Sequence, residues 1–132
     1  MNRRKFLALS GGGIIVAATA NVGTIASRTP TAALAPWDQA GVIYDAPRKR
    51  ALSYAILAPN PHNRQPWMVD LSTPDQVVLT VDTNRLLPHT DPFNRQITIG
   101  LGCFLEVMVM AAAENGFAVD LNLFPQGFDA AA

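Results

Sequence analysis

Between Pro92 and Asn115 the sequence places apolar residues on nearly every side of a segment whose spacing predicts a helix. One side carries Ile97, Leu101, Phe104, Leu105, Met108 and Ala112, and much of the other carries Ile99, Cys103, Val107 and Met110. A helix that is apolar nearly all round is buried on most of its sides. Gly100 and Gly102 would weaken an exposed helix by up to about 1 kcal/mol each relative to alanine, so we expect both to pack closely against another backbone.

Shorter predicted elements before and after this segment can pack against it and bury its apolar sides. RKRALSYAILAP has Leu52, Ala55 and Ile56 at helical spacing and predicts a helix that stops at Pro59. WMVDL and VVLTVD are rich in β-branched residues and are joined by STPDQ, which predicts a hairpin. The alternation in FAVDLNLFP predicts a third strand over residues 117–125. This order predicts an α+β fold with a central sheet and a long buried helix.

The composition supports one folded domain and excludes several kinds of site. Hydrophobic residues make up 49% and charged residues 15% of the 132 residues, which suits a buried core. The formal net charge is zero, so nothing favours nucleic acid as a partner. Cys103 is the single cysteine, and His62 and His89 are the two histidines, so we predict no metal site.

The first 35 residues have the layout of an export signal. Arg3, Arg4 and Lys5 precede a moderately apolar run that is diluted by three glycines. NRRKFLA resembles the twin-arginine export motif, which implies recognition of Arg3 and Arg4 by the Tat machinery and a final location in the periplasm or cell exterior. An N-terminal membrane anchor is the alternative, and cleavage after either Ala20 or Ala35 fits the small-residue pattern. Residues 36–47, bounded by prolines, are predicted to form a linker or peripheral arm.

A dense group of polar residues lies between the predicted first helix and the hairpin, in LAPNPHNRQPW. Asn60, His62, Asn63 and Gln65 offer donors and acceptors that suit the edge of a flat heterocycle such as a flavin or nicotinamide ring. The alternative interpretation is that Asn60 and Asn63 only satisfy the backbone of a turn and that Trp67 belongs to the core.

The start of the long helix is a second candidate site. Asp91 can cap that helix, and Pro92 fits its first position. The helix N-terminus together with the Arg95 guanidinium could bind a phosphate. Alternatively Asp91 occupies the helix end and Arg95 pairs with an acid such as Asp82. We find no serine–histidine–acid motif or phosphate loop and assign no catalytic residue, so chemistry from a bound cofactor is the better hypothesis.

Two stretches resemble a known family. LAPNPHNRQPW resembles the APS-x-x-N-x-QPW signature of the nitroreductase family of flavoproteins, and LPHTDPFNRQITIGLGCFLEVMVMAAAENGF resembles the Asp-Pro loop and central helix of its exported, Acg-like branch. The resemblance implies a nitroreductase-like α+β fold, FMN as cofactor, and hydride transfer from NAD(P)H through flavin to a small-molecule acceptor. Asn63 and Gln65 match positions that lie against the flavin, and Asn60 stands where the family usually has serine.

The same resemblance exposes departures from the family. Its basic phosphate-binding element has no clear match, since Arg48 and Arg50 lack the usual spacing. Its later helices and strands are absent, so residues 48–132 are expected to be the N-terminal part of a domain that is apparently truncated. The chain is then either an exported FMN-dependent oxidoreductase or a non-catalytic flavin-binding or structural fragment. Because its long helix is so apolar, we expect it to form a homo-oligomer.

Overall fold

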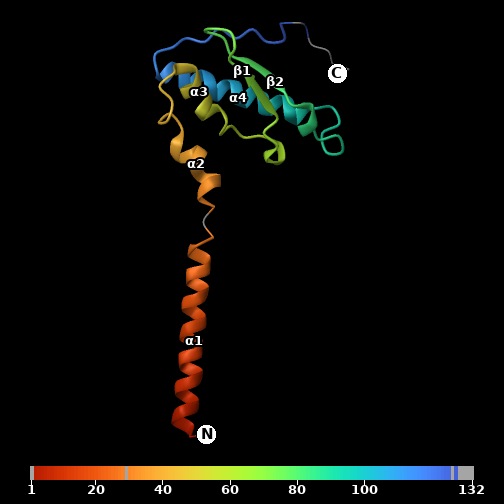
Figure 1. Ribbon diagram of the computed structural model, residues 1–132. Helices are drawn as coiled ribbons and strands as arrows, with labels where there is room; N and C mark the ends of the chain where they lie inside the picture. Colours follow the sequence, from red (N-terminus) through yellow and green to blue (C-terminus); the bar gives the residue numbers. More distant parts are fainter. Residues whose placement is uncertain (1, 29, 126, 128–132) are drawn as a thin grey trace. The chain divides into compact units, whose positions relative to one another are not determined.

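The computed structural model describes residues 2–28, 30–125 and 127 (Figure 1). The chain divides into two units, Met1–Ala35 and Pro36–Ala132. The first contains α1, Arg3–Ala26, whose amino end is capped because Asn2 Oδ1 accepts a hydrogen bond of 3.1 Å from the Arg4 N–H. A shorter helix, α2, spans Thr31–Gln39.

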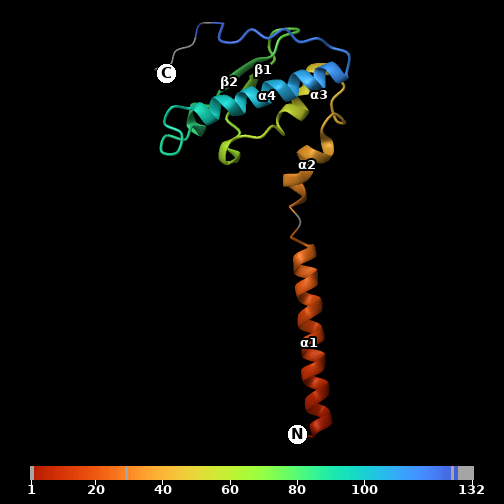
Figure 2. The same cartoon turned by 180° about the vertical axis from the view of Figure 1, so that it is seen from behind.

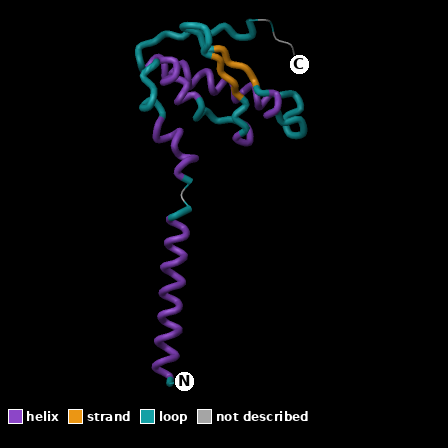
Figure 3. The backbone as a smooth tube through the Cα atoms, in the orientation of Figure 1, coloured by secondary structure: helices purple, strands orange, loops and turns teal. Residues whose placement is uncertain are grey.

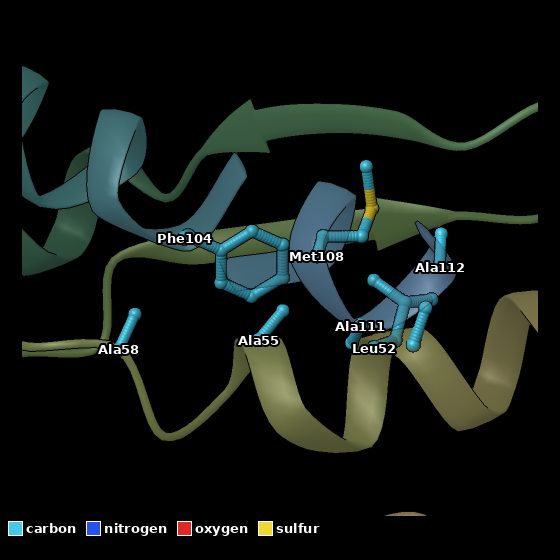
Figure 4. Packing of buried hydrophobic residues seen from close by; sticks show 8 residues of the cluster. Leu52, Ala55, Ala58, Phe104, Met108, Ala111 and Ala112 are labelled. Carbon is cyan, nitrogen blue, oxygen red and sulfur yellow. The ribbon is translucent and has the colours of Figure 1, made fainter. Parts of the chain in front are cut away.

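The second unit is built on two helices that pack against each other. They are α3, Pro47–Ala55, and α4, Arg95–Glu114. The core is a cluster of eight buried residues from these helices and the chain just after α3: Ala51, Leu52, Ala55, Ala58, Phe104, Met108, Ala111 and Ala112 (Figure 4). Five of these are alanines, whose small side chains allow α3 to lie close to α4. The predicted first helix is thereby confirmed, although it ends at Ala55.

The predicted hairpin is also confirmed. Strands β1, Trp67–Asp70, and β2, Val78–Val81, pair antiparallel, with Trp67 opposite Val81 and Asp70 opposite Val78. The hairpin covers the core through Trp67, whose ring centroid lies 5.0 Å from that of Phe104 at an interplanar angle of 39°. This tilted arrangement is a favourable one for two aromatic rings.

Arg48 holds the loop that connects the two strands. Its Nη1 donates hydrogen bonds to three main-chain carbonyls of this loop: Leu71 at 3.3 Å, Thr73 at 2.8 Å and Gln76 at 2.6 Å. At the start of the loop, the Ser72 N–H and hydroxyl donate to Asp70 and lower the pKa of that exposed carboxyl below its ordinary value. The loop conformation thus depends on α3 as well as on its own sequence.

The predicted third strand is not formed. Residues 117–124 pair with no strand, and Figure 3 draws them as loop. Val119 packs against the core, whereas Leu121 and Leu123 remain 43% and 58% exposed. Alternation of apolar residues marks a segment that can line a sheet, but a strand exists only when a neighbouring strand accepts its backbone hydrogen bonds.

The long helix begins later than predicted. Pro92 lies before the helix, and the N-cap residue is Asn94, whose left-handed φ of 53° turns the chain into α4. The Asp91 carboxylate nevertheless caps the helix, because it accepts hydrogen bonds of 3.0 Å each from the Arg95 and Ile97 N–H groups. Asp91 is only 4% exposed, so the predicted capping residue is right and its position relative to the helix is wrong.

The prediction that α4 is buried on most sides is wrong for the described part of the chain. One face packs against α3 and the hairpin: Ile97, Gly100, Phe104, Met108, Ala111 and Ala112 are buried. On the opposite side Ile99 and Met110 are 66% and 59% exposed. Figure 2 shows α4 running in front of α3 and the hairpin, which cover it from one direction.

Among the described residues, α4 is the helix that is long and apolar enough to cross a membrane by length and composition, with a mean hydropathy of 1.7. A core helix meets the same criterion. Since α4 carries the core of its unit on one face, its apolar composition has an explanation within the fold.

Candidate functional site

The polar group recognised in the sequence forms the loop between α3 and β1, residues 59–66. Pro61–Asn63 make a short 3-10 turn. His62, Asn63 and Gln65 have φ values of 50°, 51° and 49°, in the left-handed region that residues other than glycine seldom adopt. Residues in this region persist when the surrounding structure determines them, and they are concentrated at functional sites.

Asn60 determines the shape of the loop from inside. Its Oδ1 accepts a hydrogen bond of 2.7 Å from the Gln65 N–H, and its Nδ2 donates to the Ala58 carbonyl at 3.2 Å. One side chain therefore connects the beginning of the loop to its end. For Asn60 the structure agrees with the alternative interpretation, in which the side chain satisfies turn backbone.

The loop rests directly on α4 at Gly100. A Cβ at that position would lie 3.1 Å from Pro61 Cδ and 3.4 Å from Asn60 Cβ, so glycine permits a close approach of the two segments. Gly102 differs, because a Cβ there would meet nothing within 4 Å. The expectation of close packing is confirmed for Gly100 and wrong for Gly102.

This contrast predicts opposite outcomes for two identical substitutions. Gly102→Ala should raise the free energy of unfolding by about 0.5–1 kcal/mol, because alanine favours the helix and has open space. In Gly100→Ala the new methyl group gives the same helix preference but displaces Pro61 and Asn60. Its free energy of unfolding should therefore rise by less than that of Gly102→Ala, or fall. Urea denaturation of dilute protein measures both. Equal stabilisation by the two variants would contradict the close contact at Gly100.

Two arginines attach the loop to the turn that follows β2. Arg64 donates to the Arg85 carbonyl at 3.0 Å and to the Asn84 carbonyl at 3.2 Å. In return, Arg85 Nη1 donates to the Arg64 carbonyl at 3.1 Å and the Gln65 carbonyl at 3.3 Å. Asp82 orients Arg85 through an ion pair of 3.3 Å. Sequence reasoning missed Arg85, because nothing local indicates a partner 21 residues away.

The fixed backbone presents three side chains to solvent. His62, Asn63 and Gln65 are all exposed. Gln65 Nε2 donates weakly to Asn63 Oδ1 at 3.4 Å. Within the described part of the chain, this leaves a donor, Asn63 Nδ2, and an acceptor, Gln65 Oε1, available side by side. Such a pair can bind a heterocycle edge that carries both an N–H and a carbonyl.

The structure does not bring Arg95 to this loop. Arg95 lies five residues before Gly100, which in a regular helix is roughly 7.5 Å along the axis and about 140° around it. Its exposed guanidinium is 5.4 Å from the Phe93 ring centroid, and its N–H belongs to the helix end that Asp91 already occupies. Its predicted role at a phosphate stays a prediction.

Three further features of the described residues supply no second site of this kind. Two adjoining hollows, of about 300 and 190 Å³, share Tyr44, Ser53 and Ile56, and neither is lined by a loop residue. Arg50 donates to the Tyr44 carbonyl and to Asn115, so it is engaged in the fold. In residues 2–28, 30–125 and 127, no three His, Cys, Asp or Glu side chains are grouped to hold a metal ion.

Two curated proteins of Mycobacterium tuberculosis are similar to part of this chain. The one named "Putative NAD(P)H nitroreductase acg" is 33% identical over 81 residues, which are 61% of this chain and 24% of that protein. The one named "Putative NAD(P)H nitroreductase Rv3131" is 32% identical over 81 residues, which are 61% of this chain and 23% of that protein.

The chain thus spans about a quarter of the length of these relatives. No family model and no solved structure matches it. Over the 81 similar residues, this chain is a distant relative of proteins named as NAD(P)H nitroreductases.

Proposed function

We propose that this chain belongs to an exported, FMN-dependent oxidoreductase of nitroreductase type that uses NAD(P)H and a small-molecule acceptor. The observation that carries the proposal is the loop of residues 59–66, in which exposed amides stand on a backbone fixed in an unusual conformation. The similarity to proteins named NAD(P)H nitroreductases supports the oxidoreductase part of this proposal and its use of NAD(P)H.

The exposed residues fit the flavin by their chemistry. Asn63 Nδ2 and Gln65 Oε1 can donate to and accept from the polar edge of the flavin ring, and His62 adds a further hydrogen-bonding group beside them. Asn60 and Arg85 hydrogen-bond to the main chain at residues 64 and 65, so the backbone that carries these groups loses little conformational entropy on binding. FMN, when bound, would supply the redox chemistry of hydride transfer, for which this chain offers orientation and hydrogen bonds.

Arg95 is proposed as a phosphate contact that is separate from this ring-binding loop. Its exposed guanidinium provides the donors, whereas Asp91 has already engaged two of the helix N–H groups. The proposal predicts that FMN loses affinity in Arg95→Gln while riboflavin, which lacks the phosphate, does not.

The proposal is tested first by the absorption spectrum of the purified full chain and by titration with FMN. A flavin spectrum, or saturable quenching of FMN fluorescence near one equivalent per site, is the expected result. A folded, colourless chain that does not bind added FMN would favour a structural fragment instead. The fold is monitored independently by the fluorescence of Trp67, in a Trp37→Phe background.

Export by the twin-arginine route is proposed from NRRKFLA at the N-terminus. The proposal requires recognition of Arg3 and Arg4 by the Tat machinery, so replacing both by lysine should keep the charge and retain the protein in the cytoplasm. Cell fractionation measures the distribution, and a matched Lys5→Arg variant should be exported normally. Export of the double variant at the normal level would contradict this route.

A further inference from the structure

Residues 36–46, which we call the arm, are attached to one side of α3 by two hydrogen bonds. The Gly41 N–H donates to Ser53 Oγ at 2.8 Å. Arg50 Nε donates to the Tyr44 carbonyl at 3.1 Å. Gly41 has a φ of 71°, and a Cβ at this position would overlap a neighbouring side chain, so glycine is required there. The arm is therefore held as a wall beside α3.

Two adjoining hollows are lined by residues of the arm and of α3. Their volumes are about 300 and 190 Å³, and they share Tyr44, Ser53 and Ile56. The larger hollow is also lined by Lys49 and Leu52. Positions 49, 52, 53 and 56 have the spacing of one stripe along a helix, which here follows α3 to its C-cap. The larger volume lies at the lower end of the range of small-molecule sites, roughly 300–1,000 Å³.

The residues that line the larger hollow differ in their exposure. Leu52 and Ser53 are buried, whereas Tyr44, Lys49 and Ile56 are exposed. The Ser53 hydroxyl is engaged in the fold, because it donates to a main-chain carbonyl at 2.6 Å and accepts from a main-chain N–H. The surface offered to a ligand is therefore mostly apolar, with a phenol and an ammonium group at its exposed edge.

Lys49 is the charged residue of this lining within the described part of the chain. It forms no ion pair with any described residue, although Asp38 and Asp45 belong to the arm. A cation without a partner beside an apolar surface is complementary to a molecule that has an apolar body and one negative charge. A ligand cation would be repelled there, and a neutral apolar ligand would leave the charge unused.

We propose that the larger hollow is a binding site for a small amphipathic carboxylate. The apolar body of the ligand packs on Leu52 and Ile56, and its carboxylate pairs with the Lys49 ammonium group. The Tyr44 hydroxyl has no hydrogen bond with a described residue and can donate a second one to the carboxylate. No residue of the loop 59–66 lines the hollow, so this proposal does not rest on flavin binding.

The first test compares octanoate with 1-octanol as probes of the full chain. Nuclear magnetic resonance follows the Gly41 N–H, which belongs to the wall of the hollow, during each titration. Octanoate should bind saturably, and Lys49→Gln should weaken its binding about three- to fivefold while the affinity for 1-octanol stays unchanged. Lys5→Gln removes the same charge outside the hollow and should change neither affinity. Absence of octanoate binding, or an octanoate affinity that Lys49→Gln does not alter, would overturn the proposal.

The second test locates the apolar part of the ligand. Ile56→Ser should weaken octanoate and 1-octanol alike, by about fivefold, because both lose the same apolar contact. Ile99→Ser makes the same replacement at an exposed position outside the hollow and should leave both affinities as they are. Urea denaturation checks that each variant is folded. Unchanged affinities in Ile56→Ser would show that the probes bind elsewhere on the chain, and the proposal would then be wrong.

Discussion

Replacing Phe104 by alanine should reduce the free energy of unfolding by about 3–5 kcal/mol, which is a large part of the total stability of a small domain. Phe104 is fully buried, contacts the core residues of α3, and stacks at a tilt on Trp67. Its removal leaves a cavity where the hairpin meets α4. Urea denaturation followed by Trp67 fluorescence in the Trp37→Phe background measures the loss.

Phe93→Ala is the matched control, because it deletes the same side chain from a position that is 76% exposed. Its effect should stay within about 0.5 kcal/mol. Comparable losses in the two variants would show that Phe104 does not occupy the centre of the core. A stable Phe104→Ala protein would lead to the same conclusion.

The double variant Asn63→Ala/Gln65→Ala should weaken FMN binding about a hundredfold, since it deletes two hydrogen-bonding groups from the proposed ring contact. Stability should change little, because both side chains are exposed and their mutual hydrogen bond is long, at 3.4 Å. Fluorescence titration with FMN measures affinity, and urea denaturation shows that the fold is kept.

Gln76→Ala/Asn122→Ala provides the control for this variant, because it deletes the same two kinds of exposed amide outside the loop. It should bind FMN as the unaltered chain does. Equal affinity in both double variants would remove Asn63 and Gln65 from the proposed site, even where the chain binds flavin.

Secondary-structure elements, which depend on local spacing, were predicted well from the sequence. Contacts that depend on the whole chain were predicted less well. The hairpin and the long helix were predictable, because alternation and helical periodicity act within a few residues. Residues 117–125 show the same alternation but no neighbouring strand pairs with them in the structure. The exposure of Ile99 could not be foreseen either, because an apolar face does not reveal how many neighbours cover it.

In the candidate site, too, local features were predictable from the sequence and long-range contacts were not. Its composition identified the loop, and Gly100 was correctly expected to allow close packing. The left-handed backbone at His62, Asn63 and Gln65 gave only a weak signal, because no glycine marks it, although histidine and asparagine adopt this conformation more often than most residues do. Arg85 was missed because its partners are main-chain carbonyls. Every residue has such a carbonyl, so no residue type in the sequence identifies the partner.

The hydrogen bonds of Arg64 and Arg85 make the backbone conformation of this loop independent of its exposed side chains. Arg64 and Arg85 donate to carbonyl oxygens, and these acceptors remain when the side chains at His62, Asn63 and Gln65 are exchanged. Mutations at the three exposed positions can then alter ligand preference while the scaffold persists. Natural selection or a directed-evolution library can therefore vary these three positions without changing the backbone conformation of the loop.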